Sequence, residues 1–71
     1  MLFTPALPCR TIANAVASGG AILLSTGPDR FDRYVSGQGQ CALGEQTWPA
    51  WVKSADSPSC YIGYTCEQYH E

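Results

Sequence analysis

The chain has 71 residues, of which 45% are hydrophobic and 14% are charged, and its formal net charge is −2. A hydrophobic share this high excludes a disordered tail. The few basic residues form no stripe that could neutralise phosphates or anionic lipids, which excludes a nucleic-acid partner and a membrane-surface helix. The longest apolar run, residues 12–24, is too short to cross a bilayer. We therefore expect one small domain over residues 1–71, with no nucleic-acid partner and no membrane insertion.

The N-terminal residues 1–8 predict an extended arm, because Pro5 and Pro8 disfavour helix in the residues before them. This arm has no basic region and no uninterrupted apolar run, so it does not have the features of a signal peptide. Two interpretations follow. Either Met1 was added to a mature secreted domain, or the protein is made and kept in the cytoplasm.

Residues 10–20 favour a helix, since they are rich in alanine and place Ile12 and Val16 four residues apart on one face, with Gly19 at the C-cap. A strand that ends in a Gly19–Gly20 hairpin turn is the alternative. The apolar run at residues 21–25 predicts a buried strand.

Residues 28–36 carry several helix signals. Pro28 fits the first helical position, and Gly37 fits the position after the end. A helix would place Phe31, Tyr34 and Val35 on one face and would pair Asp29 with Arg33 on the other.

The glycine-rich residues 37–44 predict a loop that is held by Cys41. Pro49 then predicts either one helical turn or an edge strand, and residues 56–58 predict a turn.

Residues 59–69 read S-C-Y-I-G-Y-T-C-E-Q-Y and predict a strand with Cys60, Ile62, Tyr64 and Cys66 on the core-facing side. A strand would hold Cys60 and Cys66 roughly 20 Å apart, too far for a disulfide between them. A tight turn at Gly63 is the competing interpretation.

An even number of cysteines in a short chain is typical of a disulfide framework, so we expect Cys9, Cys41, Cys60 and Cys66 all to be oxidised. The strand leaves two arrangements open: Cys9–Cys60 with Cys41–Cys66, or Cys9–Cys66 with Cys41–Cys60. A turn at Gly63 would instead give Cys60–Cys66 with Cys9–Cys41. The predicted fold class is α+β, a small disulfide-stabilised domain with a short antiparallel sheet and one or two short helices. An all-β sandwich or barrel is the alternative, because turn signals recur about every 8–12 residues.

Metal binding and catalysis find little support. Cys41, Cys60, Cys66 and His70 could supply zinc ligands, but the chain lacks the close cysteine pairs of zinc sites, and we favour disulfides with no metal. His70 is the only histidine, the charged residues 29–33 match a solvated helix face, and the glycines match no phosphate-binding loop. We expect no catalytic residue and no cofactor.

The aromatic residues are numerous for so short a chain, and tryptophan and tyrosine are enriched at binding hot spots. We expect an exposed subset of them to form the binding surface: Trp48, Trp51, Tyr61 and Tyr69. The leading functional hypothesis is a small secreted, disulfide-stabilised, non-enzymatic protein that binds another macromolecule, with a protein partner, as an effector, toxin or inhibitor does. The alternative is a cytoplasmic inhibitor of a host protein, of the kind that phages and mobile elements carry, with reduced cysteines.

Overall fold

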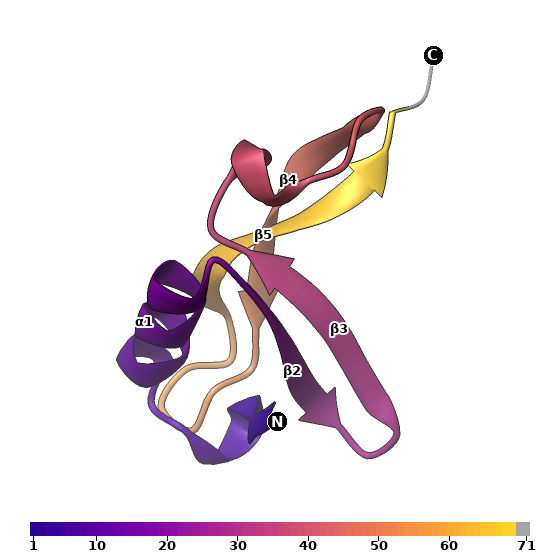
Figure 1. The fold of residues 1–71 in the computed structure, drawn as a ribbon. Coiled ribbons are helices and arrows are strands. Elements are labelled where there is room, and N and C mark those ends of the chain that lie inside the picture. Colours follow the sequence, from indigo (N-terminus) through magenta and orange to yellow (C-terminus); the bar gives the residue numbers. More distant parts are fainter. Residues whose placement is uncertain (70–71) are drawn as a thin grey trace.

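One α-helix packs against a five-stranded mixed sheet in the computed structural model, which describes residues 1–69 (Figure 1). This architecture confirms the α+β prediction. The elements, in chain order, are β1 (Leu2–Phe3), the 3₁₀ turn η1 (Thr4–Ala6), α1 (Cys9–Gly19), β2 (Ala21–Gly27), β3 (Arg30–Val35), the 3₁₀ turn η2 (Gln38–Gln40), β4 (Glu45–Val52) and β5 (Cys60–Gln68).

Helix α1 forms where the alanine-rich segment predicted it. Ile12 and Val16 lie one turn apart and are fully buried against the sheet. The helix ends one residue later than expected. Gly20, not Gly19, adopts the left-handed conformation with φ 79° and donates its N–H to Val16 O at 3.0 Å.

The helix predicted at residues 28–36 is wrong, because these residues form the turn and second strand of the β2–β3 hairpin. Asp29 adopts a φ of 58° in the turn, which reverses the chain instead of starting a helix. In β3 the aromatic and β-branched side chains that could line a helix face also suit a strand. Pairing with β2, which places Tyr34 opposite Ile22 and Asp32 opposite Leu24, outweighs the local helix signals.

The sheet has the order β1-β2-β3-β5-β4, with β1 parallel to β2 and the other neighbours antiparallel. The β2–β3 and β4–β5 hairpins meet through a single residue pair, Val35 and Tyr64. Figure 1 shows that β3 ends where it meets β5 and that the β2–β3 hairpin diverges from the β4–β5 hairpin away from this point. The buried core gathers side chains from α1 and from both hairpins: Ile12, Val16, Leu24, Tyr34, Ala50, Val52, Cys60 and Ile62.

Strand β5 confirms the strand predicted at the C-terminus but carries a bulge. Trp51 pairs with Tyr61 and Ala50 pairs with Gly63, so Ile62 is an extra residue on β5. A bulge of one residue reverses the alternation of side chains beyond it. Cys60 and Ile62 are buried in the core as expected, whereas the ring of Tyr64 lies edge-on against Tyr61 on the opposite face. The prediction that Tyr64 and Cys66 share the face of Cys60 is therefore wrong.

The disulfides are Cys9–Cys60 and Cys41–Cys66, the first of the two arrangements that the strand allowed. In both, the Cα atoms lie 5.6 Å apart. The first bond joins the start of α1 to the start of β5, and the second joins the loop after η2 to the far end of β5. Both ends of β5 are thereby fixed to segments far away in the sequence.

Strand β4 lies at the edge of the sheet, as Pro49 allows. Along the first half of β4, the backbone groups on its outer edge are nevertheless hydrogen-bonded. The side-chain amide of Gln38 donates to Glu45 O at 2.8 Å and accepts from the Thr47 N–H at 3.1 Å, so it pairs with β4 as a peptide group of a sixth strand would. Further along the strand, Pro49 has no N–H to offer, so this edge is poorly suited to pairing with another chain.

Candidate functional site

All four residues predicted to bind a partner are exposed in the structure. The exposed fractions are 53% for Trp48, 57% for Trp51, 46% for Tyr61 and 66% for Tyr69. The structure brings only two of them together. Trp48 lies three residues from Trp51 on a regular strand and so points from the opposite face of β4, and Tyr69 follows the end of β5.

Trp51, Tyr61 and Tyr64 form a continuous set of rings, which we call the aromatic patch. Trp51 and Tyr61 are cross-strand partners with ring centroids 5.5 Å apart, and Tyr61 meets Tyr64 edge-on with centroids 6.0 Å apart. Both contacts fall in the range of favourable aromatic pairs. The interaction of the Tyr61 hydroxyl with Tyr64 raises the pKa of Tyr61, and desolvation adds to this rise. The patch is therefore a preformed apolar surface with polar hydroxyl tips.

The β5 bulge creates this patch. In an unbroken strand, Tyr61 and Tyr64 would point to opposite faces, because they are three residues apart. The extra residue Ile62 brings Tyr64 to the side of Tyr61, while Gly63 faces Val16 of α1. A sequence pattern without the bulge could not place Tyr64 in the patch.

Beside the patch, a cleft of about 570 Å³ opens between the β2–β3 hairpin and the end of β4. It lies where the two hairpins diverge. The hairpin contributes one wall, which includes Asp29, Arg30, Phe31 and Asp32, and the end of β4 contributes Trp51, Val52 and Lys53. Trp51 thus belongs both to the patch and to the rim of the cleft.

Tyr34 is the buried polar residue of this cleft. Its side chain is only 6% exposed and belongs to the core cluster, yet it lines the cleft. Burial raises the pKa of Tyr34 above its usual value of 10.0, and the negative charge of Asp32 raises it further. The Tyr34 hydroxyl therefore stays protonated at physiological pH and can both donate and accept a hydrogen bond.

The charged side chains at the cleft make no ion pairs within residues 1–69. The Asp29–Arg33 pair expected from a helix is absent there because β3 is a strand, and Arg33 donates instead to Gln40 O at 3.4 Å. Asp29, Asp32, Arg30 and Lys53 remain as two carboxylates and two cations around one opening. They are free to interact with a ligand.

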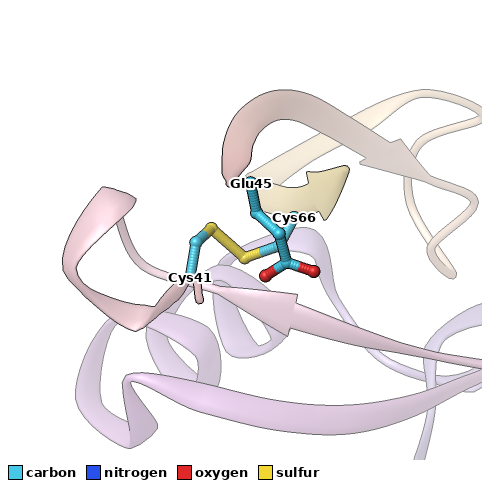
Figure 2. Close-up of side chains that lie close together, drawn as sticks. All are labelled: Cys41, Glu45 and Cys66. Carbon is cyan, nitrogen blue, oxygen red and sulfur yellow. A yellow bond between two sulfur atoms is a disulfide. The ribbon is translucent and has the colours of Figure 1, made fainter. Parts of the chain in front are cut away.

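A grouping that could resemble a metal site occurs at the second disulfide. Figure 2 shows the carboxylate of Glu45 beside the bonded sulfurs of Cys41 and Cys66, and the ligand atoms of these three residues lie within 4.8 Å of one another. The two sulfurs are joined in a disulfide, so neither can act as a thiolate ligand. The Glu45 carboxylate instead accepts a hydrogen bond from Ala42 N at 2.8 Å. His70, the other ligand considered for zinc, lies outside the described residues.

The chain was also compared with known proteins. No family model, no curated protein and no solved structure matches it. Over residues 1–69, no helix is long and apolar enough to cross a membrane.

Of the predicted binding residues, only Trp51 lines the cleft, and three of the residues that were missed are informative. Tyr34 and Asp32 were assigned to a helix, and Tyr64 was assigned to the core-facing side of β5. A usable signal existed for the first two. Residues 30–35 read R-F-D-R-Y-V, and as a strand they place Asp32 and Tyr34 on one face. For Tyr64, the signal was Gly63 within the strand, since an isolated glycine often marks a bulge.

Proposed function

We propose that this is a small secreted, non-enzymatic protein that acts by binding another macromolecule, with a protein as the partner. The aromatic patch is the observation that carries the proposal. Trp51 and Tyr61 remain about half exposed although the chain has few large side chains with which to build its core. Rigid aromatic rings that are already in contact lose little conformational freedom on binding, and such residues dominate protein interfaces.

The disulfides support the extracellular part of the proposal. All four cysteines of this small domain are paired, which is typical of proteins that fold in an oxidising compartment. Intact-mass measurement of the purified protein, with and without reductant after alkylation of free thiols, tests it. We expect no alkylation before reduction. Four alkylated cysteines in the unreduced protein would favour the cytoplasmic alternative.

The binding surface is tested by photo-cross-linking of the labelled protein in extracellular extracts, using Trp51→Ala and Tyr61→Ala. We expect proteins captured by the unsubstituted chain to be lost with both variants. Against a purified candidate, each variant should raise Kd at least about tenfold, because each ring is a large exposed anchor. The thermal midpoint should stay nearly unchanged, since neither ring is buried in the core.

Leu43→Ala is the matched control, because Leu43 is fully exposed and lies outside the patch. It should retain both partner capture and affinity. Partners that Trp51→Ala, Tyr61→Ala and Leu43→Ala all capture equally would contradict the proposal. A large fall in thermal midpoint for both patch variants would show that these rings support the fold instead.

A further inference from the structure

The cleft beside the aromatic patch has the size of a small-ligand site. Its volume of about 570 Å³ falls within the range typical of pockets that hold small molecules. Its opposite walls come from two hairpins that share only the Val35–Tyr64 pair, so the cleft is a product of how the sheet twists and divides. The disulfides and the core hold these hairpins, which makes the cleft a preformed feature.

The Tyr34 hydroxyl points to a ligand in this cleft. The ring is more than nine-tenths buried, but the hydroxyl itself is open to the cleft, and within residues 1–69 no hydrogen bond to it is found. A hydroxyl that lines a cleft and has no protein partner is available to a bound molecule.

The charges around the cleft define what kind of molecule fits. Asp29 and Asp32 supply acceptors, and Arg30 and Lys53 supply donors, so the four charges sum to zero. An anionic ligand would meet two carboxylates, and a cationic ligand would meet two basic side chains. A neutral ligand is repelled by neither set of charges, and if it can both donate and accept hydrogen bonds it can pair with all four side chains.

The rim supplies apolar contact area. Phe31 and Trp51 are among the residues that line the cleft, and they are 61% and 57% exposed. Exposed flat rings suit ligands that have one apolar face. A pyranose ring has such a face, formed by its C–H groups, and it carries hydroxyl groups around its edge.

We propose that the cleft binds a neutral sugar unit of a glycan. The sugar ring stacks on Trp51 or Phe31, its hydroxyls donate to Asp29 and Asp32 and accept from Arg30 and Lys53, and one hydroxyl pairs with Tyr34. This site goes beyond the proposed protein binding, because it uses the cleft and not the Tyr61–Tyr64 part of the patch. Only Trp51 is shared.

The test is a titration of the ¹⁵N-labelled protein with three neutral oligosaccharides, made of glucose, mannose and N-acetylglucosamine. A galacturonate oligosaccharide and an arginine-rich peptide serve as charged probes. We expect at least one neutral sugar to shift the amide signals of residues 29–34 and 51–53, with a Kd below about 5 mM. No shift with any neutral sugar at that concentration, or tighter binding of either charged probe, would overturn the proposal.

Two variants connect the binding to the cleft. Tyr34→Phe removes only the unpartnered hydroxyl, and Asp32→Asn removes one charge at an exposed position, so the second variant tests the site even if the first alters folding. Each should weaken sugar binding about fivefold or more, as the loss of one hydrogen bond to the ligand does. Unchanged affinity in both would overturn the site.

Tyr61→Ala separates this proposal from the protein-binding one. It should abolish partner capture and leave the sugar affinity unchanged, because Tyr61 does not line the cleft. Conversely, Tyr34→Phe should leave protein capture unchanged. Loss of sugar binding in Tyr61→Ala would contradict the assignment to the cleft, whatever happens to the protein partner.

Discussion

Gly63 lies directly against the backbone of Val35, at the point where the two hairpins of the sheet meet. A Cβ at position 63 would lie 2.7 Å from Val35 O and 3.0 Å from Val16 Cγ1, and Gly63 has a φ of 140°. Neither the distance nor the backbone conformation suits any other residue. The close approach of helix, β3 and β5 therefore depends on a missing side chain.

We expect Gly63→Ala to lower the free energy of unfolding by about 2–4 kcal/mol, through backbone strain and overpacking together. Thermal or denaturant unfolding measures this change. Gly37→Ala is the control, since Gly37 is extended and no heavy atom lies within 4 Å of its added Cβ. Equal stability of the two variants would show that the bulge can move away from Val35.

The two disulfides should differ in their contribution to stability. The Cys9–Cys60 bond spans 51 residues and ends on the buried Cys60, whereas the Cys41–Cys66 bond spans 25 residues and is partly exposed at both ends. The chain-entropy model gives about 4 kcal/mol for the first and about 3.5 kcal/mol for the second. Replacing Cys60 also leaves a cavity in the core.

We therefore expect the double variant Cys9→Ala/Cys60→Ala to have a lower melting temperature than Cys41→Ala/Cys66→Ala. Limited treatment with dithiothreitol, followed by alkylation and peptide mass analysis, should open Cys41–Cys66 first, because its sulfurs are more accessible. Earlier reduction of Cys9–Cys60 would contradict the burial argument.

Asp56 caps helix α1 from a loop far away in the sequence. Its Oδ1 accepts hydrogen bonds from the Cys9 N–H at 2.9 Å and from Ser54 Oγ at 2.8 Å, where Pro8 offers no capping side chain. These bonds, led by the one from Cys9, lower the pKa of Asp56 below its usual value of 3.8. The charged carboxylate is thus favoured in the folded state.

Since the folded pKa lies below the unfolded one, the contribution of Asp56 is complete above about pH 4 and is lost as the pH falls through the folded pKa. We expect Asp56→Asn to melt at a lower temperature than the unsubstituted protein at neutral pH. The difference should shrink as the pH falls to about 2. A difference that does not change with pH would mean that the carboxylate charge plays no part in the cap.

The Gln38 amide gives a further prediction at the edge of β4. Gln38→Ala removes both hydrogen bonds to the strand and should cost about 1–2 kcal/mol. It should also expose the backbone of Glu45 and Thr47, and so raise the tendency to associate through strand pairing. Unfolding and analytical ultracentrifugation measure the two effects. Gln40→Ala is the matched control, because no hydrogen bond from its side chain is found within residues 1–69.

Several features of the fold could be predicted from local sequence. Ile12 and Val16 repeat at the helical period and mark α1, and the apolar run that contains Leu24 marks β2. The spacing of Cys60 and Cys66 in a strand excluded a bond between them, which narrowed the disulfide pairing. The exposure of Trp51 and Tyr61 was expected as well, although their contact was not.

Other features depended on the pairing of one strand with another. Pro28, Asp29 and Gly37 carry helix signals, yet Tyr34 and Asp32 lie in a strand because β2 is already in place to pair with them. Tyr64 lies on the opposite face of β5 from the one predicted, because β5 has one extra residue, Ile62, opposite the regular strand β4. Neither pairing can be read from one strand alone, because the neighbouring strand decides how each of these segments folds.

The sequence by itself determined the small size of the core, the helix α1, the last strand and the need for two crosslinks, because these depend on composition and on short-range periodicity. Only the tertiary structure decided the β3 strand, the aromatic patch and the cleft. The physical reason is that hydrogen bonding between strands and the meeting of two hairpins act over distances that local preference does not reach. Tyr34 illustrates this, since its burial, its raised pKa and its unpartnered hydroxyl all arise from segments that fold around it.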